Sequence, residues 1–301
     1  MTSATATQVL GAVDLRPKRS VSTRLWATAR KKPIGAIAAV LCIALIVVAI
    51  LAPFILGDPA KSDPIANPRL QAPSVGHLFG TDNLFRDVFS RILVGARNSI
   101  GIGFASVALA TVLGAALGII GGYLGKWADL IISRVLDVII GIPPLIFAIF
   151  MLTVFPRTFF TVSLTIAVVF MPTTARIVRS SVLSIRNLQY IEAAISTGSS
   201  SIRVMSRHIL PNVVAPIIVV ASIQIGNAIL TEAALSFLGL GTATDSQPSW
   251  GKMLQDSRPV WQSAWWMSII PGGAISLAVL SFNLFGDALR DVLDPRLRGA
   301  S

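Results

Sequence analysis

Long apolar stretches alternate with shorter polar ones along most of this chain. The first apolar stretch, residues 34–56, is long enough to cross about 30 Å of hydrocarbon as a helix. Five further apolar stretches follow at about residues 99–124, 129–155, 159–177, 212–234 and 266–288. The pattern therefore predicts an all-α polytopic membrane protein with six transmembrane helices.

Glycine residues in the second span predict close helix packing, and proline residues in the third predict a kink. Gly114, Gly118 and Gly122 recur every four residues, which places three positions without side chains on one helix face. We expect that face to pack closely against another helix. Pro143 and Pro144 lie near the middle of the third span and predict a kink or a break there.

The polar stretches divide the chain into five parts. Residues 1–33 form a basic tail, residues 57–98 a loop rich in proline, and residues 291–301 a second tail, while residues 99–290 hold the last five spans as a core. Within the loop, Thr81-Asp82 predicts the start of a surface helix. Its apolar side would comprise Leu84, Val88, Phe89, Ile92 and Leu93, packed on the membrane domain.

Residues 188–211 form the longest polar interruption in the second half of the chain. The spacing of Leu188, Ile191, Ala194 and Ile195 predicts a short helix, which Gly198 would end by taking a positive φ. One of the serines 199–201 would cap a second helix, which Pro211 would end. The apolar residues of that second helix are Ile202, Met205 and Ile209. We therefore expect two short helices joined at a bend.

Composition supports the membrane interpretation, and charge orients it. The chain is 53% hydrophobic and 13% charged, with a mean hydropathy of +0.74. Its net charge of +11 comes from side chains beside the spans, without interleaved aromatics, so no nucleic-acid partner is expected. Sixteen of the 25 Lys and Arg would lie on the side of the N-terminal tail and residues 188–211, against eight on the other side. This bias predicts that both termini are cytoplasmic and that residues 57–98 are external.

No pattern of residues indicates a catalytic, cofactor or metal centre. A phosphate-binding G-x-x-x-x-G-K-[ST] loop is absent from the sequence, so any ATP would be used by another subunit. His77 and His208, the two histidines, fall on opposite predicted sides, and Cys42, the one cysteine, lies in an apolar stretch. Arg134 and Asp137 lie three residues apart in the third span, and we expect them to neutralise each other near its cytoplasmic end.

Residues 188–211 resemble the EAA loop of permease subunits in bacterial ATP-driven (ABC) importers. The matching residues are Glu192-Ala193-Ala194, Gly198 and Ile209-Leu210-Pro211. Three more segments resemble the C-type permeases for dipeptides and oligopeptides: residues 79–97, L-S-F-L-G-L-G at 235–241, and D-P-R-L-R-G at 294–299. That family more commonly has glycine where this chain has Phe85.

The resemblance implies a type I ABC importer permease fold in a bacterial plasma (inner) membrane. It implies a second, similar permease, two ATPase subunits or domains that use ATP, an extracytoplasmic binding protein, a peptide substrate and contact with lipid. This chain itself would bind no cofactor. The residues implied in coupling to the ATPases are Tyr190, Glu192, Ala193, Ala194, Gly198, Arg203, Arg207, Ile209, Leu210 and Pro211.

Four alternatives remain at this point. A related permease could carry nickel or another metal chelate. An ion-coupled secondary transporter could use Arg134, Asp137 or Glu232, although no convincing internal repeat is present. The chain could also be a structural membrane subunit without a pathway of its own. Finally, residues 188–211 could lie on the lipid surface as an amphipathic segment.

Overall fold

The computed structural model describes residues 33–62, 64 and 68–293, and within them the chain is helical. Five helices are long and apolar enough to cross a membrane: α2 (Pro33–Ile55), α3 (Val88–Leu124), α6 (Phe159–Ile185), α9 (Leu210–Phe237) and α11 (Trp266–Leu293). Counted as one broken span, α4 (Lys126–Ile140) and α5 (Pro144–Val154) bring the number to six. The expected all-α membrane fold is confirmed. Most of the two predicted tails, residues 1–32 and 294–301, falls outside the described residues.

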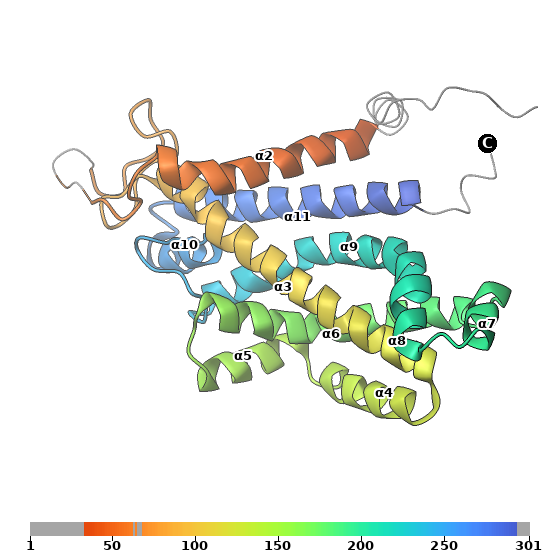
Figure 1. Ribbon diagram of the computed structural model, residues 1–301. Coiled ribbons are helices and arrows are strands. Elements are labelled where there is room, and N and C mark those ends of the chain that lie inside the picture. The colour runs from red at the N-terminus through yellow and green to blue at the C-terminus, as the bar shows by residue number, and fades with distance from the viewer. Residues whose placement is uncertain (1–32, 63, 65–67, 294–301) are drawn as a thin grey trace, which may run out of the picture.

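The long helices form one bundle with a cluster of short helices at each end (Figure 1). In this bundle α2 and α11 lie side by side, and α3 crosses it in contact with α2, α6 and α9. At one end lie α10 (Trp250–Ser257) and the short turn Arg258–Val260. At the other end lie α7 (Gln189–Ser196) and α8 (Ser201–Val204). We call these the α10 end and the α7 end.

Helix α2 packs on the bundle through small residues and turns its large ones outward. Its buried residues are Ala38, Cys42, Ala49 and Ala52. Its exposed ones include Ile37, Val40, Ile43 and Ile50. A Cβ atom on Gly35 would lie 2.5 Å from the Cβ of Ala288 in α11, so the two backbones are in close approach. Small residues at the interface and large ones facing lipid are typical of helices packed inside a membrane.

The glycine stripe of α3 lies against α6. A Cβ atom on Gly114 would be 2.7 Å from the Cβ of Thr174, and one on Gly122 would be 2.8 Å from the Cβ of Val182. A Cβ atom on Gly118 would meet the backbone itself, 2.6 Å from the carbonyl oxygen of Ala175. Only a hydrogen atom fits at these three positions, and the absence of side chains lets α3 and α6 approach to backbone contact.

Helix α3 is longer than the span expected from residue 99. It begins at Val88, where the Asp87 carboxylate accepts a hydrogen bond of 2.8 Å from the Ser90 amide. The expected separate surface helix is therefore wrong, because Val88 and Ile92 are buried in the first turns of the span. Asp82 does not start a helix either. Its carboxylate accepts from the amides of Leu84 and Arg86, and such side-chain bonds favour a turn over a helix.

The break predicted in the third span is confirmed. Helix α4 ends at Ile140, α5 begins at Pro144, and the two axes differ in direction by 88°. Pro143 excludes a helical conformation at Ile142, because its ring would clash with the preceding residue. The chain therefore turns through almost a right angle between α4 and α5.

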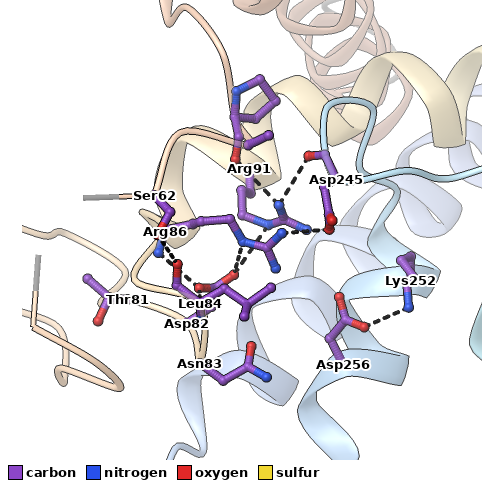
Figure 2. Close-up of polar contacts among 12 residues, drawn as sticks. Ser62, Thr81, Asp82, Asn83, Leu84, Arg86, Arg91, Asp245, Lys252 and Asp256 are labelled. Atoms are coloured by element: carbon purple, nitrogen blue, oxygen red, sulfur yellow. Dashed lines mark hydrogen bonds and ion pairs between the residues drawn. The ribbon is translucent and has the colours of Figure 1, made fainter. Parts of the chain in front are cut away.

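A cluster of charged residues, buried except for Asp245, holds the loops together at the α10 end (Figure 2). Arg86 lies between two carboxylates: its Nε is 2.6 Å from Asp82 Oδ2, and its Nη1 is 2.7 Å from Asp245 Oδ1. Arg91 approaches Asp82 Oδ2 to 3.7 Å and donates to the carbonyls of Pro59 and Asp245. We call Asp82, Arg86, Arg91 and Asp245 the ion cluster. It joins the loop before α3 to the loop after α9, and Arg86 lowers the pKa of the Asp245 carboxyl.

Phe85 has a backbone conformation that glycine adopts more easily than phenylalanine. Its φ of 60° lies in the left-handed region, where a side chain costs about 1–2 kcal/mol. We therefore expect Phe85→Gly to raise the thermal stability of the purified protein by up to about 1 kcal/mol, because lost contacts of the ring offset part of the gain. Phe85→Val should lower it, since a β-branched residue fits this conformation worse. A lower melting temperature for the glycine variant than for wild type would contradict this explanation.

Candidate functional site

The bend within residues 188–211 has the geometry that its glycine predicted. Gly198 has a φ of +81°, so the expected positive φ is confirmed. The amide of Ser199 donates to the carbonyl of Ala194 at 3.0 Å, and the amide of Gly198 to that of Ile195 at 2.9 Å. This pair of bonds is a Schellman motif, which satisfies the last carbonyls of α7. The motif fixes the angle at which the chain leaves the helix.

The second short helix continues into the membrane, which corrects the expectation that Pro211 ends it. Ser200 caps α8, its Oγ accepting from the Arg203 amide at 3.4 Å. A π-helical turn, Met205–Ile209, follows and leads directly into α9. Its wider hydrogen-bond ring, from the Leu210 amide to the Met205 carbonyl, makes room for the ring of Pro211. A displacement of α8 is therefore passed to α9 without an intervening loop.

The inner face of residues 188–211 packs on three long helices. Ile191, Val204 and Ile209 are fully buried. They belong to one apolar cluster with Val178 and Val182 of α6, Ala115 and Ile119 of α3, and Val213 of α9. The sequence pattern places Ile202 on the same face as Ile209, but Ile202 is 75% exposed. The helix α8 projects from the bundle, and the π-helical turn changes which residues of the segment share a face with Ile209. The segment is thus anchored on helices α3, α6 and α9.

The outer face of the same segment combines apolar and charged residues. Leu188, Tyr190, Ile195 and Ile202 are exposed there, and so are Glu192, Arg203 and Arg207. Within the described part of the chain these three charged residues form no ion pair. Of the other residues implied in coupling, Ala193, Leu210 and Pro211 are exposed and Ala194 is half-buried. An exposed apolar patch with unpaired charges is typical of a protein-binding surface.

Helix α6, which leads into this segment, also holds α4. Arg179 forms a bidentate pair with Asp129, whose second contact, Nη2 to Oδ2, is 2.6 Å. Arg176 Nη2 lies 2.7 Å from Asp137 Oδ1. The expected pairing of Asp137 with Arg134 is therefore wrong: Asp137 reaches across to α6 instead of along its own helix. Leu136, the one buried residue of α4, packs with Ile132 and Ile139 against Met171 and Ala175 of α6, and the two ion pairs lie beside this apolar contact.

Glu232 is fully buried in α9 towards the α10 end. Ser236 donates to its Oε1 at 2.6 Å, while its Oε2 is buried without a hydrogen-bond partner among the described residues. The carboxyl group is therefore enclosed within the packed part of the structure.

Comparison with known proteins shows that this chain is a permease subunit of an ATP-driven importer. The match to a family model is direct: residues 110–299 fit the binding-protein-dependent transport system inner membrane component, and the chain belongs to this family. The fold agrees, because the chain is similar to a solved inward-facing MetNI methionine ABC transporter. The TM-score is 0.53 at 18% identity, over 67% of this chain and 96% of that one.

Three relatives cover most of the chain. It is 43% identical over 270 residues to the dipeptide transport system permease protein DppC of Alkalihalophilus pseudofirmus, which covers 89% of this chain and 88% of that protein. It is 40% identical to the probable D,D-dipeptide transport system permease protein DdpC of Escherichia coli, covering 89% of each. It is 38% identical to the glutathione transport system permease protein GsiD of Shigella boydii, covering 97% of each. The resemblance to C-type peptide permeases is confirmed.

Proposed function

We propose that this chain forms half of the pathway through which an ATP-driven importer takes up dipeptides and short oligopeptides. The names of its relatives support the cargo: dipeptide, D,D-dipeptide and glutathione are all short peptides. The other half of the pathway comes from a second, similar permease. A binding protein delivers the peptide at the α10 end, and the membrane is the plasma membrane of a bacterium.

ATP is bound and hydrolysed by two partner ATPase subunits or domains, and this chain binds no cofactor. One observation carries this part of the proposal, namely the outer face of residues 188–211. It carries exposed apolar side chains and unpaired charges on a segment whose inner face is anchored on α3, α6 and α9. Such a segment moves as one body with the spans when its outer face is held in a groove of the ATPases.

The proposal places the α7 end and both termini in the cytosol, because lysine and arginine are in excess there. We expect single cysteines at Val75, which is 100% exposed, and at Ser196 to react with an impermeant thiol reagent from opposite sides. The background is Cys42→Ser, which removes the one native cysteine. Only the Val75 position should react in intact cells, and both should react after permeabilisation. Labelling of both positions in intact cells would contradict the orientation.

Replacing Glu192 by lysine tests whether residues 188–211 bind the ATPases or anionic lipid. On a lipid surface the added cation would be neutral or favourable. In a protein groove it reverses a charge that the partner must match, so we expect a loss of ATPase subunits on purification and a drop in peptide uptake of about tenfold or more. The measurements are subunit stoichiometry, ATP hydrolysis and uptake.

Ser184→Lys is the matched control, because it adds one exposed cation at the end of α6, outside the segment. It should leave subunit stoichiometry and uptake at wild-type levels. Normal stoichiometry and uptake in Glu192→Lys would contradict docking of this face on the ATPases.

A further inference from the structure

Arg97 differs from the two other arginines of its region in having no acidic partner. Arg86 and Arg91 are buried in the ion cluster, whereas Arg97 is exposed in the third turn of α3. Among the residues described, it makes neither an ion pair nor a hydrogen bond. An exposed arginine without an acidic partner is free to bind a carboxylate, which makes Arg97 a candidate for recognising a charged ligand.

A cavity of about 690 Å³ adjoins Arg97 at the α10 end. The end of α2, the loop after it, α3, the start of α6 and residues 246–248 enclose this space. Its charged and amide side chains are Asp58, Arg97, Asn98 and Gln247. The volume falls in the range of pockets that bind small organic molecules. We call it the outer cavity.

Asn98, next to Arg97, has a hydrogen-bond donor without a partner. Its Oδ1 accepts from the Thr242 hydroxyl at 3.2 Å, while its Nδ2 is buried and bonded to no acceptor among the described residues. This Nδ2 has almost no accessible surface, so a ligand in the outer cavity cannot reach it. The exposed guanidinium of Arg97 is therefore the group that offers a carboxylate two parallel N–H donors.

Asp58 contributes the opposite charge to the outer cavity. Its carboxylate is exposed and accepts from the Ala60 amide at 2.9 Å, but it forms no ion pair with Arg97. The cavity therefore presents one cationic and one anionic side chain that leave each other unneutralised. A ligand that carries an ammonium group and a carboxylate matches this arrangement.

A second cavity, of about 420 Å³, shares Arg97 and Gly101 with the first. It lies between α2 and α3 and is otherwise lined by apolar side chains, among them Ile50, Phe54 and Phe104. Ile50 and Phe54 are exposed on the lipid-facing side of α2, so this second space is open to lipid. Arg97 thus lies between lipid and the outer cavity, with an aliphatic stem suited to the first and a guanidinium suited to the second.

We propose that the outer cavity binds a short zwitterionic peptide by its two ends. Arg97 binds its carboxylate, and Asp58 binds its ammonium group. This site rests on the proposed function, since it gives the peptide a place on the permease itself.

The test uses the purified importer complex in nanodiscs, without the binding protein, so that recognition by the permease is measured alone. A dipeptide with a benzophenone side chain labels the complex on illumination. Competitors are an unmodified dipeptide, its C-terminal amide and its N-acetyl form. In wild type we expect the dipeptide to compete at concentrations at least about tenfold lower than either derivative, because each derivative removes one charge-assisted bond.

The variants should separate the two ends. Arg97→Gln should abolish the preference for the dipeptide over its C-terminal amide and keep the preference over its N-acetyl form. Asp58→Asn should abolish the preference over the N-acetyl form and keep the preference over the amide. Arg97→Lys should keep most of the preference over the amide, because it keeps the charge. Arg157→Gln is the matched control: this arginine at the same end donates to the Gly239 carbonyl and lines a different cavity. It should behave as wild type.

Two results would overturn the site. One is an unchanged preference in Arg97→Gln. The other is that Arg97→Gln loses bound phospholipid, measured by native mass spectrometry, while peptide competition is unaltered. That result would mean that Arg97 binds a lipid phosphate. Failure of the proposed function is distinguishable from both, because cells with the wild-type complex would then take up no peptide.

Discussion

Gly198→Val is expected to abolish peptide uptake while the permease still inserts and assembles in the membrane. Gly198 holds a φ of +81°, which a β-branched residue can adopt only at a cost of about 2 kcal/mol or more. A Cβ atom there meets nothing within 4 Å, so the whole effect comes from the backbone. Relaxation of the bend would change the angle between α7 and α8, and the outer face would no longer fit its groove. Uptake should fall by about tenfold or more, with hydrolysis of ATP no longer stimulated by substrate.

Gly198→Asn is the matched control, because asparagine tolerates the left-handed conformation best among residues with a side chain. It should retain most of the uptake. Equal loss in the asparagine and valine variants would mean that the side chain, not the backbone angle, is responsible. Wild-type uptake in Gly198→Val would show that the angle of this bend is irrelevant to coupling.

Gly118→Leu is expected to prevent stable assembly of the bundle. Even a Cβ atom at this position would lie 2.6 Å from the Ala175 carbonyl oxygen and 2.8 Å from the Val178 Cβ, so α3 and α6 must separate. Overpacking of this kind costs about 1–3 kcal/mol, and here the obstacle is backbone that cannot rotate away. The expected result is a severe loss of membrane-inserted protein, measured by quantitative immunoblotting and by size-exclusion chromatography of the detergent extract.

Gly273→Leu provides the control within α11. A Cβ atom on Gly273 meets nothing within 4 Å, so the same substitution should leave abundance and transport unchanged. Gly118→Ala should already lower abundance, whereas Gly273→Ala should be neutral or mildly stabilising because alanine favours helix. Normal abundance of Gly118→Leu would contradict the close contact between α3 and α6.

Local patterns in the sequence were sufficient for much of the fold. Apolar length located the spans, because the hydrocarbon core sets a minimum that few other segments reach. Pro143 predicted the break between α4 and α5, and Gly198 predicted its own positive φ, since each acts through the backbone of its own position. Features of this kind can be predicted without knowing which helices pack against them.

Features that depend on a partner helix were missed or wrong. Asp137 was assigned to Arg134, its neighbour in sequence, although it pairs with Arg176 on α6. Val204 was not expected to anchor the 188–211 segment, because the π-helical turn that sets its register has no simple sequence signal. For the same reason the sequence wrongly predicts a helix end at Pro211. The Arg179–Asp129 pair joins α6 to the first turn of α4, and the sequence gives no signal of which residues face each other across two helices.

The length of α3 has a thermodynamic consequence. Its 37 residues span about 55 Å, well over the roughly 30 Å of hydrocarbon, so the helix projects beyond the bilayer. Arg91 in its first turn belongs to the ion cluster, and Ala115 and Ile119 near its other end contact the helices at the α7 end. Under the proposed function, the binding protein and the ATPases act on opposite ends of one rod. The two binding events are then reciprocally linked. Docking of the binding protein changes the affinity of the ATPases for ATP, and ATP changes the affinity of the permease for the binding protein by the same factor.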